Sequence, residues 1–244
     1  MRKIIYSIVV ALLTLTTVRA EELTAEQFLD IVRKPPRAES WAKMQGDIVH
    51  KERNKKTISA PIYLAIKFTP NRLLGQVVIN NDFGYMIGQA YTQGADSTSV
   101  ISMNDEEGIY KYKLSDFGVR PDDLTMSFLY WDFVEELEST TIKGQKTRLM
   151  ILESPNKNTL VKVYISSSYY FPLKVEWFKK VEKNSEYYRK LEITSFQKKN
   201  DFWLIKGLTV SGPGWKTLIK FNDTDAELMN DASKNIFLNL NSNK

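Results

Sequence analysis

The chain has 244 residues, of which 43% are hydrophobic and 26% are charged, and its formal net charge is +5. It contains no cysteine, which excludes disulfides, thiolate metal sites, thiol catalysis and the lipid-bearing cysteine of a lipoprotein. A chain of this length buries enough apolar surface to be stable without disulfides. We therefore expect one domain that is held together by its hydrophobic core.

The first twenty residues have the three parts of a secretory signal peptide. Arg2 and Lys3 precede an almost wholly apolar or small run over residues 4–18, and small residues occupy the cleavage positions that end at Ala20. The run of about 15 residues is shorter than the roughly 20 that a membrane-spanning helix needs. The pattern predicts a cleaved signal peptide over 1–20 and an exported, unanchored domain over 21–244. The alternative is an uncleaved N-terminal anchor.

Cleavage would also remove most of the positive charge. Arg2, Lys3 and Arg19 leave with the signal peptide and no acidic residue goes with them, so the net charge falls by three, from +5 to +2. The remaining Lys and Arg residues are scattered among Asp and Glu, without the basic stripe that a phosphate-backbone binder needs. The sequence therefore predicts no nucleic-acid partner.

A helix is expected at the start of the exported chain, over residues 23–32. Apolar residues recur there at helical spacing, and Thr24 is placed to cap the first turn together with Gln27 three positions on. A pair of prolines ends this helix and leads into a second short helical turn toward Trp41 and Met44.

Most of the remaining chain alternates apolar and polar residues with a period of two, which is typical of half-buried strands. Turn-forming residues separate the segments. The pattern predicts about ten to eleven antiparallel strands in a meander. The expected strands cover residues 62–68, 73–79, 83–91, 99–103, 109–113, 147–152, 160–165, 172–180, 187–196, 202–210 and 215–221.

Three other segments interrupt this alternation. Residues 121–129 begin with proline and two acids, as a first helical turn does, and predict a short helix. Residues 104–108 combine oxygen-bearing side chains with a glycine but lack the spacing of a calcium loop, so they predict a hairpin turn. Residues 225–229 predict a further helical turn near the C-terminus.

Few residues could carry chemistry. The single histidine, His50, lies in a polar run and is predicted to be a surface residue, so histidine-based triads and metal sites are excluded. Two adjacent acid pairs, Asp122 with Asp123 and Glu135 with Glu136, leave a carboxylate-dependent hydrolase as an alternative, although a helix start and a solvated strand explain them. The sequence predicts neither an enzyme nor a cofactor.

A sheet of about ten strands curls, and its apolar face must be covered by a second sheet, by helices or by a ligand. No second set of strands is left over, and the predicted helices over 23–32 and 121–129 are the available cover. Two alternatives follow: a hydrophobic cavity that binds a ligand, and a tightly packed core.

The order of elements and several motifs resemble one protein family, the outer-membrane lipoprotein-sorting proteins of the LolA/LolB-like superfamily. The resemblance implies an unclosed antiparallel β-barrel with an α-helical lid, and a soluble periplasmic carrier that takes the acyl chains of a lipoprotein or lipid from an inner-membrane donor to an outer-membrane acceptor. The motifs that carry it lie at 75–80 (GQVVIN), 116–124 (DFGVRPDDL), 128–131 (FLYW), 143–145 (KGQ), 170–177 (YFPLKVEW) and 212–215 (GPGW).

In such a carrier, side chains on the inward strand faces and on the second helix would line the cavity. The assignment of faces follows from alternation. The predicted lining residues are Leu64, Ile66, Phe68, Val77, Ile79, Phe128, Leu129, Trp131, Met150, Leu152, Val161, Val163, Val175 and Trp177.

The resemblance further implies a polar latch between an arginine of the barrel and the lid. The motifs do not place this arginine; Arg53, Arg72 and Arg148 are the candidates, and a solvated strand residue is the alternative for each. The competing function is a non-catalytic periplasmic structural or interaction module on the same scaffold.

Overall fold

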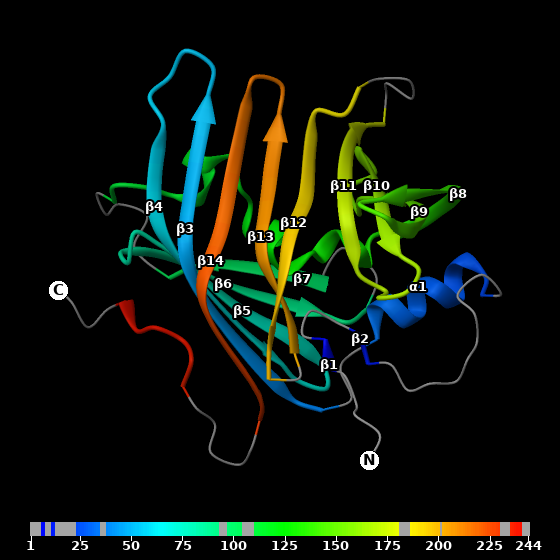
Figure 1. Ribbon diagram of the computed structural model, residues 1–244, viewed down its shortest axis with the longest axis horizontal. Helices are drawn as coiled ribbons and strands as arrows, with labels where there is room; N and C mark the ends of the chain where they lie inside the picture. The colour runs from blue at the N-terminus through cyan, green and yellow to red at the C-terminus, as the bar shows by residue number, and fades with distance from the viewer. Residues whose placement is uncertain are drawn as a thin grey trace.

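The computed structural model describes residues 6–7, 11–12, 23–34, 38–92, 97–103, 110–180, 186–200, 202–229 and 235–240. These residues form one antiparallel sheet and a few short helices (Figure 1). The strands are β3 (Ser40–Glu52), β4 (Ile58–Phe68), β5 (Arg72–Ile79), β6 (Phe83–Ala90), β7 (Thr98–Ser102), β8 (Asp132–Ile142), β9 (Gln145–Glu153), β10 (Thr159–Ser166), β11 (Pro172–Lys179), β12 (Arg189–Lys199), β13 (Phe202–Gly212) and β14 (Trp215–Leu228).

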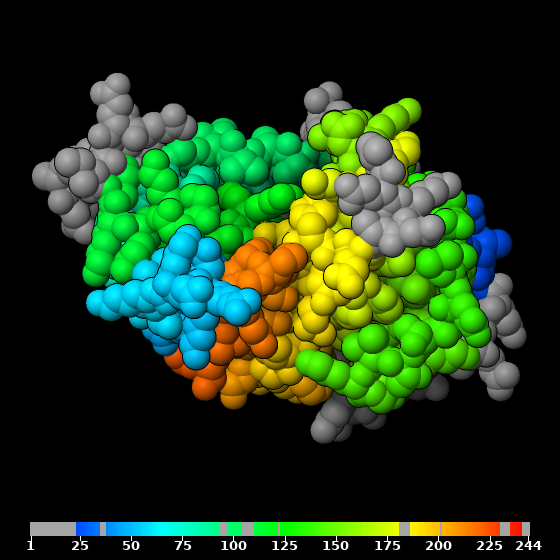
Figure 2. All heavy atoms as spheres, turned by 90° about the horizontal axis from the view of Figure 1, so that it is seen from above, coloured from blue at the N-terminus to red at the C-terminus, as the bar shows by residue number. Residues whose placement is uncertain are grey.

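The strand order is β7-β6-β5-β4-β3-β14-β13-β12-β11-β10-β9-β8. Two meanders, β3 to β7 and β8 to β14, are thus joined side by side through the pairing of β3 with β14. The sheet bends so strongly that β5 and β6 cross behind β13 and β14 in Figure 1. Seen from above, the strands curve round from β4 (cyan) through β14 (orange) to β12 (yellow) and the green strands beyond (Figure 2). Because β7 and β8 stand at the two ends of this order, the described sheet is an unclosed barrel, as the sequence predicted.

Helical segments lie on the concave side of the sheet. They are α1 (Ala25–Arg33), which precedes β3, and three short segments between β7 and β8: η2 (Leu114–Phe117), α2 (Pro121–Thr125) and η3 (Ser127–Tyr130). Their apolar side chains join the inward faces of the strands in one core cluster. Phe28, Phe117 and Phe128 are among its largest fully buried members. The helices therefore cover the face for which no second sheet is available.

The first predicted helix is confirmed, and its start has the predicted capping box. The Thr24 backbone N–H donates to the Gln27 side chain (3.0 Å), and the Gln27 backbone N–H donates to the Thr24 hydroxyl oxygen (3.3 Å). The second predicted helix is present but interrupted. Met126 adopts a left-handed conformation (φ 55°) between α2 and η3, so residues 121–129 form two short turns and not one helix.

Three predictions of local structure were wrong. The expected turn toward Trp41 and Met44 is the start of β3, the expected helical turn over 225–229 is mainly the end of β14, and residues 110–113 of the expected strand 109–113 are not in a strand. Strand β3 was missed, and β8 was indicated only by the interpretation of Glu135 and Glu136 as residues of a solvated strand, so the described sheet has more strands than expected. The hairpin turn predicted over 104–108 lies outside the described residues.

Little of the predicted signal peptide is described. Tyr6–Ser7 and Ala11–Leu12 form the two-residue strands β1 and β2, and Tyr6 pairs with Phe202 at the start of β13. Cleavage after residue 20 stays a prediction. In the described part of the chain, no helix combines the length and the apolar character that crossing a membrane requires.

Candidate functional site

The concave face brings the predicted lining residues together. Thirteen of the fourteen belong to the buried core cluster of the concave face, and Trp131, after η3, packs against it half-buried. The strand register places them opposite one another, as in the pairs Leu64 with Val77 and Met150 with Val163. The predicted faces are therefore right, whereas a role in binding a ligand stays a prediction.

The helix α1 fills one end of this face. Phe28, Leu29 and Val32 are turned inward and are at most 2% exposed. The ring of Phe28 lies 5.2 Å from that of Tyr170, which precedes β11. Since α1 contacts the edge strand β8 and the short helix η3, it covers the core at the open side of the barrel. We call α1 the lid.

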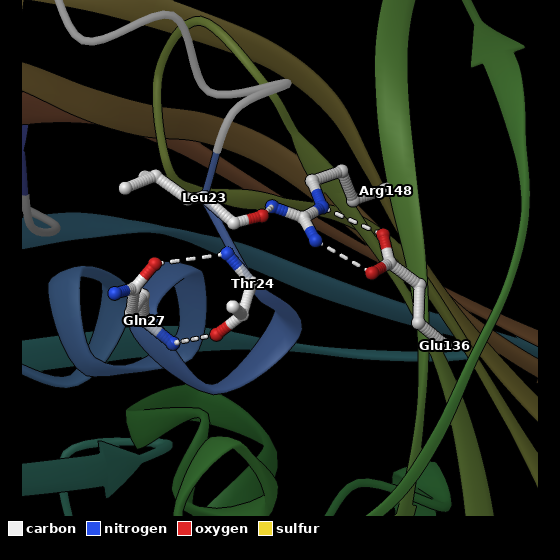
Figure 3. Close-up of polar contacts among 5 residues, drawn as sticks. All are labelled: Leu23, Thr24, Gln27, Glu136 and Arg148. Atoms are coloured by element: carbon white, nitrogen blue, oxygen red, sulfur yellow. Dashed lines mark hydrogen bonds and ion pairs between the residues drawn. The ribbon is translucent and has the colours of Figure 1, made fainter.

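Arg148 of β9 ties the start of the lid to the barrel (Figure 3). Its guanidinium donates two hydrogen bonds to the Glu136 carboxylate on β8 (2.6 and 2.5 Å) and a third to the backbone carbonyl of Leu23 (3.0 Å). It also lies 4.6 Å from the centre of the Phe28 ring. Of the three candidate arginines, Arg148 therefore has the position of a latch. Arg53 and Arg72 are exposed.

Arg33, which the sequence analysis did not single out, fastens the other end of the lid. Its side chain donates to the backbone carbonyls of Leu129 (2.6 Å) and Trp131 (2.7 Å). Burial lowers the pKa of its guanidinium from the ordinary value, while Asp30, Tyr130 and Asp132 oppose this shift. Because a charged donor forms strong hydrogen bonds, these two contacts hold the end of the lid against η3.

A third buried arginine secures the segment between η2 and α2. Arg189 of β12 pairs with the Asp123 carboxylate and donates to the carbonyl of Gly118 (2.6 Å), and its guanidinium lies 5.5 and 5.8 Å from the rings of Trp177 and Trp215. The alternation of Arg189 with Leu191 and Ile193 would have placed it on the inward face. That pattern is the sequence signal that could have revealed it.

His50 is not the surface residue that the sequence predicted. It is 8% exposed, and its Nδ1 lies 2.8 Å from the Thr217 hydroxyl oxygen. Because that hydroxyl donates its proton to the carbonyl of Phe117, His50 donates from Nδ1. The polar run in which it lies is the end of β3, where His50 faces inward against Trp215. Its role is to connect β3 and β14 to η2.

Three acids of the two pairs have described side chains, and two of these three form ion pairs. Asp123 forms an ion pair with Arg189, and Glu136 forms one with Arg148, while Glu135 is exposed. The described residues also contain no group of three or more acidic, His or Cys side chains that could hold a metal ion. The arrangement supports structural roles for these carboxylates.

The core reaches the surface at a pocket between β11 and β12. These strands pair only from Lys174 to Trp177, after which β12 continues alongside β13. The gap leaves a pocket of about 210 Å³. Three of its lining residues belong to the core and three aromatic ones are 40–52% exposed. The lining residues are Gln145, Tyr169, Phe171, Leu173, Phe196, Trp203 and Ile205.

Comparison with solved structures places this geometry among known folds. The chain is similar to a DUF1329 family protein from Desulfovibrio piger (12% identity, 84% of this chain and 91% of that chain covered, TM-score 0.58). It is also similar to a domain from Vibrio parahaemolyticus described as an outer membrane lipoprotein-sorting protein (15%, 84% and 94%, 0.57) and to a LolA superfamily protein from Nitrosomonas europaea (10%, 86% and 96%, 0.54).

The sequence itself matches no family model and no curated protein. At identities of 10–15% the likeness concerns the fold. The resemblance seen in the sequence is confirmed at that level: this chain has the open, helix-covered barrel of LolA-superfamily and lipoprotein-sorting proteins.

Proposed function

We propose that the chain is a non-enzymatic periplasmic carrier, which binds the acyl chains of a lipoprotein or lipid on the concave face of the barrel and delivers them toward the outer membrane. In this proposal residues 1–20 are removed on export. The cargo comes from an inner-membrane donor and passes to an outer-membrane acceptor.

One observation carries the proposal: the apolar concave face is covered by a lid that polar contacts hold at its ends. Arg148 fastens the start of α1 and Arg33 fastens its end. Hydrogen bonds to water can replace these polar contacts when the lid opens, so the main cost of opening is the exposure of its apolar side chains. A lid fastened in this way is suited to opening and closing.

The energies of exchange are compatible with this role. Exposing Phe28, Leu29 and Val32, which are buried under the lid, costs roughly 5–9 kcal/mol at about 1.5–3 kcal/mol per side chain. An acyl chain gains about 0.8 kcal/mol per buried methylene, so a myristoyl chain contributes roughly 10 kcal/mol. One such chain is therefore enough to replace the lid side chains in the core.

The pocket between β11 and β12 supports a path for the acyl chain. It joins the surface to Phe171, Leu173 and Ile205 of the core. The turn that supplies Tyr169 and Phe171 also carries Tyr170, which contacts Phe28 of the lid. Displacing Phe28 would thus free the same turn that forms the wall of the pocket.

The proposal is tested by uptake of an environment-sensitive fluorescent fatty acid by purified full-length protein. We expect saturable binding of the probe, competition by unlabelled diacyl lipid, and a bound lipid in native mass spectra of gently purified protein. A protein that takes up no probe and carries no lipid would rule out the carrier.

One observation favours a second candidate, the non-catalytic structural or interaction module. In the described residues the concave face is filled, since helix side chains such as Phe28, Phe117 and Phe128 are at most 2% exposed. If this packing is permanent, the barrel is a scaffold and not a container. Hydrogen exchange separates the two: a carrier exposes the lid amides far more often than the amides of β13, and a scaffold exposes both at the same low rate.

A further inference from the structure

The outer face of the sheet carries an apolar patch over β3, β4 and β5. The alternation that turns Leu64 and Val77 into the core points their neighbours Tyr63 and Val78 outward, where polar, solvated side chains are expected. The outward side chains of this patch are nevertheless buried, and most of them form a second apolar cluster. The buried residues are Trp41, Tyr63, Ala65, Gln76 and Val78.

Residues 235–240, which we call the tail, cover this patch (the red segment near the C-terminus in Figure 1). Ile236 is 4% exposed and belongs to the outer cluster, with Phe237 and Leu240 packed against it. The Leu240 side chain lies over Gly84 of β6, where a Cβ would come within 2.9 Å of it. The tail carries no charged residue. Its apolar side chains pack against the apolar patch, and we call the surface that they occupy the groove.

Side chains of the groove form hydrogen bonds with the main chain of the tail. The Gln76 amide, wholly buried, donates to the carbonyl of Leu238 (2.8 Å) and accepts from the backbone N–H of the same residue (2.7 Å). The Tyr63 hydroxyl donates to the carbonyl of Ile236. The Leu238 side chain is 39% exposed, although its backbone is held at both polar atoms. These contacts would be the same for many sequences in an extended conformation.

We propose that this groove is a peptide-recognition site, whose ligand is an extended, uncharged segment of a partner protein with apolar side chains at the positions of Ile236 and Leu240, and that the tail is its internal, displaceable occupant. The Gln76 side-chain amide offers a peptide main chain one donor and one acceptor, the same pair of groups that the main chain of a sheet edge offers to an added strand. The apolar contacts of the side chains at positions 236 and 240, on either side of Leu238, supply the specificity. The proposal concerns the outer face and does not depend on lipid binding at the concave face.

Tethering gives the tail an effective concentration in the millimolar range. A free peptide of the same sequence with a dissociation constant of about 100 μM would therefore bind the intact chain about tenfold more weakly than a chain whose tail is released.

A fluorescein-labelled peptide of residues 235–240 is the probe, and fluorescence anisotropy with the full-length protein is the readout. Ile236→Ser releases the tail and should tighten peptide binding about tenfold over the wild type. Leu238→Ser makes the same chemical change at an exposed side chain and is the matched control, with wild-type binding expected. Gln76→Met, added to Ile236→Ser, removes both main-chain hydrogen bonds and should weaken the binding again at least tenfold.

Equal peptide binding by the Ile236→Ser and Leu238→Ser proteins would overturn the proposal. So would unchanged binding after Gln76→Met, or displacement of the peptide by a free fatty acid, which would make the groove a lipid site. Circular dichroism melts verify that each variant is folded. Should Ile236→Ser fail this check, Leu240→Ser releases the tail at its other seat and is judged by the same criteria.

Discussion

Replacing the latch arginine should open the lid without unfolding the barrel. Arg148→Met keeps most of the aliphatic length of the side chain and removes the charge. The loss includes the two hydrogen bonds to Glu136, the one to the Leu23 carbonyl and the cation–π contact with Phe28. We expect the lid to open more often because these contacts join it to β8 and β9.

The size of the effect follows from the contacts that reach the lid itself. A hydrogen bond to a charged group contributes about 1.5–3 kcal/mol and a partly exposed cation–π contact about 0.5–1 kcal/mol. The Arg148 side chain is 10% exposed and the Glu136 side chain 26%, so solvent screens the pair in part. Taking about 2 kcal/mol for the Leu23 and Phe28 contacts together, the open population rises about 30-fold.

The assay is hydrogen exchange followed by mass spectrometry. Amides of α1 in Arg148→Met should exchange about 30-fold faster than in the wild type, and those of β13 should not change. Arg72→Met is the control, since Arg72 is an exposed arginine on β5. Unchanged exchange in α1, or an equal acceleration over the whole barrel, would refute the assignment of Arg148 as the latch.

Three further outcomes are expected. Cysteines placed at Asp30 and Asp132, which line one surface pocket, should stop fatty-acid uptake when joined by a short cleavable cross-linker, and cleavage should restore it. Asp123→Asn should lower the free energy of unfolding in urea by about 3–5 kcal/mol, because it leaves Arg189 buried without its carboxylate. Burial raises the pKa of Tyr130 to about 12, whereas the pKa of a tyrosine in the unfolded chain is about 10. The stabilisation by neutral Tyr130 is therefore complete below pH ~10 and disappears as the pH rises toward 12. The urea midpoint of the Tyr130→Phe protein should fall less than that of the wild type over this interval.

Several of the strands that the sequence revealed have one solvated face, although β4 and β5, which lie under the tail, do not. In β10 and β11 inward Val161, Val163 and Val175 alternate with more exposed or polar residues, so the period of two is plain. This contrast is weaker in β3 and β8, which were not among the expected strands. In β3 both faces are apolar in part, because Trp41 is buried under the tail. The edge strand β8 is largely exposed and carries the charges typical of a protected edge.

The site was only partly accessible from the sequence, because its polar contacts join residues far apart in the chain. Alternation and the family resemblance sufficed for the lining faces, and Arg148 was among three candidates for the latch. The choice among them depends on the β8–β9 register, which brings Glu136 beside Arg148. Arg33 and Gln76 were not recognised, since their partners are main-chain atoms, which leave no mark on the sequence.

The pairing of β3 with β14 has a consequence for how the molecule is assembled. The first and last long strands are neighbours in the middle of the sheet and pair from Ser40 to Glu52, with one register shift between Phe221 and Asp223. Until the C-terminal strand is available, β3 has an open edge, and the two meanders can form but not join. Such non-local pairing slows folding and leaves strand edges exposed until β14 pairs with β3. A protein exported N-terminus first would thus cross the membrane with its central seam unformed, and would acquire a concave face able to hold anything only after its last strand has arrived.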